Sequence, residues 1–270
     1  MGFFSWLLRR NKPKKIKLGL ALGSGGAKGF AHLGALKAFE ENGIEFDMVA
    51  GASIGSVVGA FYSAGYSSTD ITELLSRIDV NEIKNLFMIR MDTFGLFKVI
   101  DREIGSINIE ELKKPFKAVA TLLESGEEHV FESGSVAKAL CASSSIPPFF
   151  KPVVINGVRY VDGAFSNSVP ADVVKKMGAD YVVGIDLSTR DTKPSILSKF
   201  FPIFKSKVAS PWAKGYEFSD TILHPDLSNY SAVSFSQGKI MFDIGYRHAL
   251  SFIPNIKKDI EQLTLNKKNK

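Results

Sequence analysis

The sequence predicts an α/β fold, a three-layer α/β/α arrangement whose central sheet is mainly parallel. Short aliphatic segments alternate with longer helical segments, which is the pattern of parallel strands joined by covering helices. The first two aliphatic segments each end in a glycine-containing turn that leads directly into a helical segment. The chain has 270 residues and is 45% apolar, enough for one large core, so we expect one domain over residues 16–265.

The N-terminal half is expected to hold two strands and three helices before a less regular region. Aliphatic residues predict strands over Ile16–Leu22 and Met48–Ala50, and apolar patterning predicts helices over Ala27–Glu41, Ile54–Ala64 and a third segment ending at Arg77. Ser68 or Thr69 is expected to cap that third helix. Residues 80–105 contain the apolar pieces Leu86–Ile89 and Phe94–Phe97, which either line an acyl site or belong to an ordinary core.

The C-terminal half is expected to alternate strands and helices in the same way. Asn156-Gly157 between two aliphatic segments predicts a β-hairpin, because this dipeptide suits a tight primed turn. The remaining segments are expected as paired strands over Phe116–Glu124 and Glu128–Phe131, helices over Ser135–Ala142 and Pro170–Met177, strands over Tyr181–Asp186 and Thr221–His224, and helices over Gln237–Phe252 and Asn255–Leu263. This alternation implies a mainly parallel sheet covered on both faces.

Positive charge is concentrated at the N-terminus. The net charge is +6, and residues 1–17 carry six Lys and Arg and no acid, so the rest of the chain is balanced. That balance argues against a basic surface for nucleic acid. Residues 1–15 form a separate segment in which apolar and aromatic residues precede the basic ones, the reverse of the order in a secretory signal. Such a segment suits either a membrane interface or a solvated terminus.

A second mixed segment lies within residues 190–215, where apolar side chains alternate with lysines. It is either a flap that contacts a membrane through residues 193–215 or a solvated connecting helix. No run approaches the ~20 apolar residues of a membrane span. Cys141 is the single cysteine, which suits a reducing compartment. We therefore expect a cytoplasmic protein, with peripheral contact at the inner face of the membrane as an option for residues 1–17 and 193–215.

The sequence Gly51-Ala52-Ser53-Ile54-Gly55 lies between the second strand and an apolar helix. This G-x-S-x-G pattern between strand and helix is typical of a nucleophile elbow, whose sharp turn exposes the serine. Gly51 and Gly55 are needed there because larger side chains would collide with the strand or the helix. The helix also directs unpaired N–H groups at the turn and so favours negative charge there. The alternative is a serine in a turn that only packs a helix on a strand.

A glycine-rich turn, Gly23-Ser24-Gly25-Gly26-Ala27-Lys28-Gly29, follows the first strand and opens a helix. Such a turn leaves backbone N–H groups directed at one spot, where an anion is stabilised. Two nucleotide-binding patterns fail here, because Lys28 stands where G-x-G-x-x-G requires glycine and no lysine completes the P-loop pattern. The turn therefore fits an oxyanion hole better.

A serine nucleophile needs a base within hydrogen-bond reach. Asp162 stands beside Gly163 at the end of the hairpin strand, which is a position typical of a site residue. An aspartate in a turn also commonly binds its own backbone. His224 or His248 could instead complete a Ser–Asp–His order. The residues alone leave these arrangements open.

Three of these stretches, in this order, resemble the patatin-like phospholipase family in its small bacterial form. They are Gly23–Gly29 ahead of His32-Leu33-Gly34, the elbow Gly51–Gly55, and Asp162-Gly163-Ala164 running into Val169-Pro170. The stretch Ala142–Pro147 is also similar to that family, and the resemblance covers residues 17–186. Mild departures at Ser24, Lys28 and Ala164 remove no catalytic group.

The resemblance implies a patatin-like fold and a catalytic Ser–Asp dyad, with Ser53 as nucleophile and Asp162 as base. It also implies that the N–H groups of Gly25, Gly26 and Ala27 form the oxyanion hole. The expected activity is hydrolysis of a phospholipid, a lysophospholipid or another acyl ester.

No cofactor and no metal are expected, because the chain offers no compact cluster of His, Cys and carboxylate residues. One alternative is a non-catalytic, membrane-associated protein of the same fold that binds lipid or a partner. A nucleotide-binding protein that uses the glycine-rich turn is a second alternative, weakened by the failed spacings. The sequence leaves the oligomeric state undefined.

Overall fold

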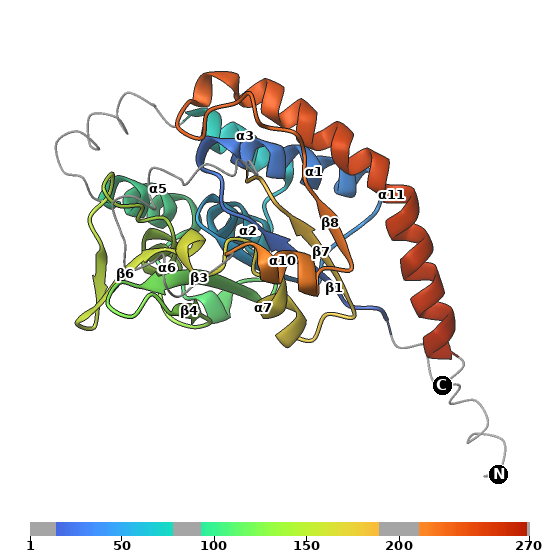
Figure 1. The fold of residues 1–270 in the computed structure, drawn as a ribbon, viewed down its shortest axis with the longest axis horizontal. Coiled ribbons are helices and arrows are strands. Elements are labelled where there is room, and N and C mark those ends of the chain that lie inside the picture. Colours follow the sequence, from blue (N-terminus) through green and yellow to red (C-terminus); the bar gives the residue numbers. More distant parts are fainter. Residues whose placement is uncertain (1–14, 78–92, 189–210, 269–270) are drawn as a thin grey trace, which may run out of the picture.

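The computed structural model describes residues 15–77, 93–188 and 211–268, which form a twisted sheet between helices (Figure 1). The strands are β1 (Leu18–Leu22), β2 (Met48–Ala52), β3 (Phe116–Leu122), β4 (Glu128–Phe131), β5 (Val153–Ile155), β6 (Val158–Asp162), β7 (Tyr181–Ile185) and β8 (Thr221–Leu223). Hydrogen-bonded neighbours follow the path β5-β6-β3-β2-β1-β7-β8, and β4 pairs with β3 off this path.

Parallel pairing dominates the sheet, as predicted. Strands β3, β2, β1, β7 and β8 run parallel to their neighbours in that order. Antiparallel pairing is confined to the end near β3, where β4 and β6 pair with β3 and β5 pairs with β6. The β5–β6 hairpin turns at Asn156 and Gly157, both with positive φ, which is the primed-turn geometry expected from this dipeptide.

Helices cover both faces of the sheet and make the predicted three layers. They are α1 (Phe30–Glu41), α2 (Ile54–Ala64), α3 (Ser68–Arg77), α5 (Phe94–Ile104), α6 (Val136–Ser143), α7 (Ala171–Lys176), α10 (Ala213–Phe218) and α11 (Gly238–Lys268). Alternate strand residues face opposite layers. Leu20 and Val49 pack in the larger core with α1, α2 and α11, whereas Ala21 and Ala50 pack in a second core with α7.

Two helix starts differ from the sequence-based expectation. The segment expected to be helical from Ala27 begins with a 3-10 turn over Gly26–Gly29, and the α-helix starts at Phe30. The cap of α3 is Ser67, because its Oγ accepts the Asp70 N–H at 3.1 Å and its own N–H donates to the Asp70 carboxylate at 2.9 Å. This reciprocal pair satisfies two groups at once, which neither Ser68 nor Thr69 does.

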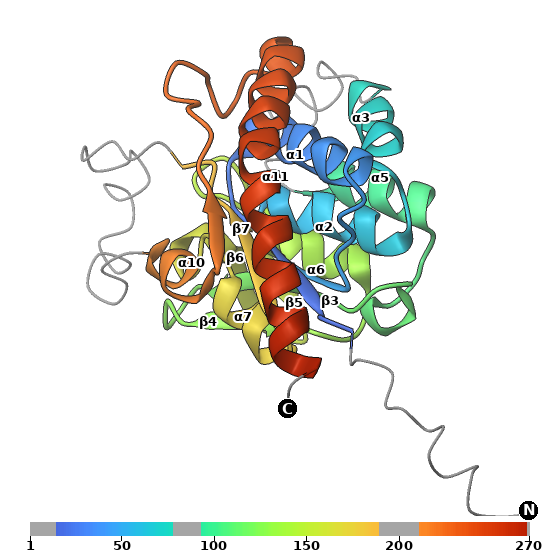
Figure 2. The same cartoon turned by 90° about the vertical axis from the view of Figure 1, so that its right-hand side faces the viewer.

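The expectation of two C-terminal helices, over Gln237–Phe252 and Asn255–Leu263, is wrong. A single helix, α11, continues through Pro254 and runs along the outer side of α1 (Figure 2). The residues buried on its inner face lie on both sides of the proline, at Met241, Gly245, Ala249, Ile253 and Ile256. Packing on both sides outweighs the hydrogen bond that the proline removes.

Several predicted segments lie wholly or largely outside the described residues. These are the N-terminal segment 1–15, the apolar piece Leu86–Ile89 and most of the flap at 190–215. Among the residues that the structure describes, none of the helices has the length and apolar character needed to cross a bilayer.

Candidate active site

Ser53 occupies a sharp turn between β2, which ends at Ala52, and α2, which starts at Ile54. Its φ is 54° and its ψ is −129°, a conformation that residues other than glycine rarely adopt. A Cβ at Gly51 would lie 2.3 Å from the Gly55 carbonyl oxygen, and one at Gly55 would lie 2.1 Å from the Leu22 carbonyl oxygen. Both glycines therefore stand where the backbone segments of the elbow touch.

The side chain of Ser53 meets that of Asp162. Ser53 Oγ donates a hydrogen bond to Asp162 Oδ2 at 2.6 Å, and both residues are buried. The other Asp162 oxygen, Oδ1, accepts the Ala164 N–H at 2.8 Å, which fixes the plane of the carboxyl group. Asp162 therefore makes both contacts. One is the local hydrogen bond to backbone that is expected of an aspartate in a turn, and the other is the hydrogen bond from Ser53.

Neither of the two histidines that could have completed a triad binds Asp162. His224 Nε2 bonds to the Ser188 carbonyl oxygen at 2.8 Å, and His248 Nε2 accepts the His224 N–H at 3.1 Å. The arrangement found in the described residues is thus a serine bonded directly to an aspartate.

The sheet explains why residues 109 positions apart in the chain meet. Val119 of β3 pairs with Ala52 of β2 on one side and with β4 on the other, and the next residue, Ala120, pairs with Asp162 of β6 and again with β4. Since β4 occupies one edge of β3 at both positions, β2 and β6 share the opposite edge. They run toward each other along it, and their ends place Ser53 against Asp162.

Burial dominates the electrostatics of Asp162. Removal from water penalises the charged carboxylate and raises its pKa to about 7, while the hydrogen bonds from Ser53 and from the Ala164 N–H oppose that rise. A carboxyl group with a pKa near neutrality both accepts and returns a proton readily in that range.

The glycine-rich turn lies directly against the elbow. A Cβ at Gly29 would lie 2.3 Å from the Ile54 side chain. The turn is held by backbone bonds from the Gly23 N–H to Ile185 and from the Ser24 N–H to Ser168, at 2.9 and 3.0 Å.

The three expected oxyanion donors differ in their availability. The Ala27 N–H donates to the Ala232 carbonyl oxygen at 2.7 Å and is therefore engaged. Within the described part of the chain, the N–H groups of Gly25 and Gly26 have no hydrogen-bond acceptor. The turn thus has two backbone N–H groups that no acceptor in the described residues occupies.

His32 holds the start of this turn by a hydrogen bond. Its Nε2–H donates to the Gly23 carbonyl oxygen at 2.7 Å, and the side chain is fully buried. Burial lowers the pKa of His32 to about 4, so the ring is neutral at physiological pH. A neutral ring here fixes the first residue of the turn without adding charge.

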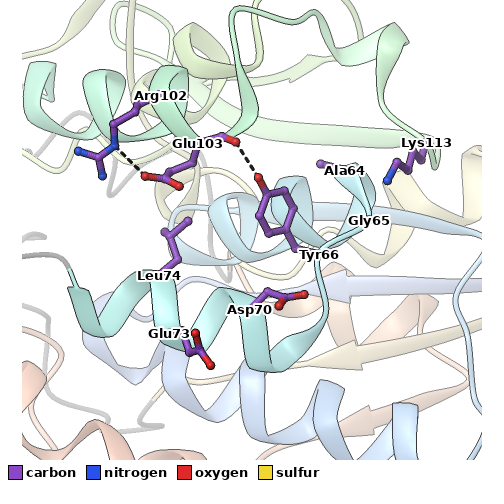
Figure 3. A pocket seen from close by; sticks show the side chains of 9 residues that line it. All are labelled: Ala64, Gly65, Tyr66, Asp70, Glu73, Leu74, Arg102, Glu103 and Lys113. Atoms are coloured by element: carbon purple, nitrogen blue, oxygen red, sulfur yellow. Dashed lines mark hydrogen bonds and ion pairs between the residues drawn. The ribbon is translucent and has the colours of Figure 1, made fainter.

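The described residues contain a pocket of about 570 Å³ away from this site (Figure 3). It lies at the far end of α2, about 16 Å from Ser53 for a helix of 11 residues. Tyr66 reaches across it to the Glu103 carbonyl oxygen. None of the site residues expected from the sequence lines this pocket. No group of three His, Cys, Asp or Glu that could hold a metal ion occurs in the described ranges.

Two supporting residues were not assigned a role from the sequence. Ser143 Oγ accepts the Ser53 N–H at 2.9 Å, and the Ser145 carbonyl oxygen accepts the Asp162 N–H at 2.8 Å. Both belong to the stretch Ala142–Pro147, whose family resemblance was the one available signal. The sequence did not reveal that this stretch touches both members of the pair.

Fold and site together define a class, the α/β proteins that present a serine on a nucleophile elbow beside a glycine-rich turn. Comparison with known proteins identifies the family within this class. Residues 20–175 match the sequence model of the patatin-like phospholipase family, and the chain belongs to that family.

Curated relatives agree with this family. Neuropathy target esterase sws of Drosophila melanogaster is 30% identical over 185 residues, which cover 64% of this chain and 13% of that protein. An uncharacterized NTE family protein of Mycobacterium tuberculosis is 31% identical over 205 residues, covering 72% of this chain and 57% of the relative. The match therefore spans little more than half of the mycobacterial relative's length and about an eighth of the Drosophila relative's length.

Solved structures share the fold. VipD from Legionella pneumophila superposes with a TM-score of 0.54 at 14% identity, covering 90% of this chain and 67% of VipD. The type III effector ExoU of Pseudomonas aeruginosa gives 0.53 at 13% identity, covering 94% of this chain and 54% of ExoU.

Proposed function

We propose that this protein is a serine hydrolase of lipid acyl esters, with a phospholipid or lysophospholipid as substrate. The observation that carries the proposal is the 2.6 Å hydrogen bond from Ser53 Oγ to Asp162 Oδ2 on a nucleophile elbow. Family membership supports the lipid substrate.

In the proposed reaction, Ser53 Oγ attacks the ester carbonyl carbon while Asp162 takes the hydroxyl proton. The N–H groups of Gly25 and Gly26, with the N-terminus of α2, stabilise the oxyanion of the tetrahedral intermediate. Asp162 then returns the proton to the leaving alcohol, and an acyl-enzyme remains. Water that transfers a proton to Asp162 attacks this ester, and the fatty acid leaves as Ser53 recovers its proton.

Residues 1–17 and 193–215 are proposed to hold the protein at the inner face of a membrane. Their mixture of apolar and basic residues supports this contact. A cytoplasmic enzyme with this contact would reach its lipid substrate without a spanning helix.

Labelling with a fluorophosphonate, read by intact mass, tests the catalytic proposal. Wild type should gain one adduct and Ser53→Ala none. Asp162→Asn should react more slowly than wild type, by up to about a thousandfold. Ser63→Ala is the matched control, because Ser63 is a buried serine in α2, the helix that follows Ser53, and its hydroxyl has no partner within the described residues. It should label as wild type does. A folded wild type that remains unlabelled with and without lipid vesicles would favour the non-catalytic alternative.

A further inference from the structure

Ser143 lies at the C-terminal end of α6 and is fully buried. Its hydroxyl accepts the Ser53 N–H at 2.9 Å and donates to the Val119 carbonyl oxygen at 2.6 Å. The side chain thus connects the residue that forms the elbow with the central strand β3.

This hydroxyl lies where a direct backbone hydrogen bond between the end of β2 and β3 would otherwise form. The Val49 N–H of β2 donates to the Pro115 carbonyl oxygen, and Val49 pairs with Phe116. Parallel ladders repeat every two residues, so the same pattern four residues later would join the Ser53 N–H directly to the Val119 carbonyl oxygen. In the structure, the Ser143 hydroxyl stands between these two groups and binds both.

An inserted hydroxyl has a geometric consequence for Ser53. It holds the elbow away from β3 by the size of one oxygen atom while still satisfying both buried backbone groups. At the same turn of the chain, the Ser145 carbonyl oxygen accepts the Asp162 N–H at 2.8 Å. The end of α6 therefore contacts both members of the pair, one through a side chain and one through the backbone.

We propose that Ser143 is a positioning residue, whose hydroxyl sets the place of Ser53 relative to Asp162 and the oxyanion donors. This proposal rests on the proposed function, because it assigns Ser143 a role in that same site. Without the hydroxyl, the Ser53 N–H either loses its partner or moves toward Val119 to bind its carbonyl oxygen. Either change displaces Ser53 Oγ from Asp162, and a displacement of about 1 Å in a catalytic site can lower the rate on the order of a hundredfold.

The test compares Ser143→Ala, Ser143→Cys and the control Ser63→Ala in hydrolysis of a water-soluble ester. For Ser143→Ala we expect kcat to fall about 10- to 100-fold and KM to change less than about threefold, because the substrate contacts remain. Ser143→Cys keeps a donor and acceptor, weaker and larger than the hydroxyl, and should lie between wild type and alanine. Ser63→Ala should match wild type, and circular dichroism confirms that each variant is folded.

The pH profile separates positioning from general loosening of the structure. The hydrogen bond from Ser53 holds down the pKa of Asp162, so its loss raises that pKa further. The acid limb of the kcat profile should therefore move to higher pH in Ser143→Ala and stay in place in Ser63→Ala.

Each contrary outcome has a distinct meaning. A folded Ser143→Ala with the kcat and the acid limb of wild type overturns the positioning role of Ser143 but not the proposed function. An equal loss of kcat in Ser63→Ala has the same meaning. If Ser143→Ala fails to fold, a fully active Ser143→Cys overturns it. A wild type that neither hydrolyses esters nor reacts with the fluorophosphonate overturns the proposed function as well.

Discussion

At the residue scale, the candidate site depends on a carboxyl group that is expensive to bury. Asp162 is fully buried, it has no cationic hydrogen-bond partner within residues 15–77, 93–188 and 211–268, and its pKa is raised to about 7 by desolvation. A purely structural position would be occupied more favourably by a neutral side chain. The raised pKa is instead suited to proton transfer, so this residue is expected to reduce stability while serving the reaction.

Replacing Asp162 by Asn should therefore stabilise the protein at neutral and higher pH. Between about pH 4 and 7 the unfolded Asp162 is ionised, whereas the folded one stays protonated. The folded state then binds more protons, so stability falls as pH rises through this window. We expect Asp162→Asn to exceed wild type in free energy of unfolding by about 1 to 4 kcal/mol at pH 8, and by less at pH 5.

Urea unfolding at the two pH values measures this difference. A variant that is less stable than wild type at pH 8, or equally displaced at both pH values, would contradict the burial of an ionisable Asp162. Loss of labelling in the same variant would show that the gain in stability comes at the expense of activity.

At the element scale, α11 packs on α1 through direct contact of the two backbones as well as through buried side chains such as Met241, Ile253 and Ile256. A Cβ at Gly34 of α1 would lie 2.0 Å from the Phe242 carbonyl oxygen, and one at Gly245 of α11 would lie 2.1 Å from the Ala31 carbonyl oxygen. The two helices therefore cross where each has a glycine. This close packing explains why the helix tolerates Pro254 in its interior.

Replacing Pro254 by Ala should stabilise the protein by about 1 to 3 kcal/mol, because alanine restores an N–H donor and favours helix. Pro254 is exposed, so little packing is lost. Chemical denaturation measures the change, and Ser251→Ala, an exposed position in the same helix, should shift stability by less than about 0.5 kcal/mol. A destabilised Pro254→Ala would mean that α11 needs a bend at the proline to follow α1.

At the scale of the whole molecule, the excess positive charge is concentrated at the N-terminal end of the chain. The six positive charges of residues 1–17 equal the net charge of +6, so the remainder is balanced. Lys15 pairs with Asp47 at 2.7 Å and belongs to the folded part, whereas four of the six charges precede it. The terminus can therefore be removed just before Lys15 without breaking that contact.

Deleting residues 1–14 should weaken binding to vesicles that contain anionic lipid and leave hydrolysis of a water-soluble ester unchanged. Each lysine or arginine near an anionic surface contributes about 1 kcal/mol, so four of them amount to at most about 4 kcal/mol. Co-sedimentation with anionic vesicles at two salt concentrations measures the loss, and zwitterionic vesicles are the control. Equal binding of the full chain and the shortened one would identify residues 1–14 as a solvated terminus.

The sequence by itself determined what is local. Strand–glycine turn–helix order, the elbow at Gly51–Gly55 and the hairpin turn at Asn156-Gly157 follow from steric and hydrogen-bond preferences within a few residues. These preferences act in any context, so the α/β fold with a mainly parallel sheet was predicted and is confirmed. The residues alone pointed to Asp162 as a site residue but left open whether His224 or His248 completes a Ser–Asp–His order. The family resemblance implied that Asp162 itself is the base.

Only the tertiary structure decided what depends on distant segments meeting. The Ser53–Asp162 contact arises because β2 and β6 end at adjacent positions on one edge of β3. The engagement of the Ala27 N–H by Ala232 and the insertion of Ser143 likewise join segments far apart in the chain. The same holds for α11, whose continuity through Pro254 depends on α1. No local pattern encodes these contacts, because each is set by the order of strands and the packing of helices over the whole sheet.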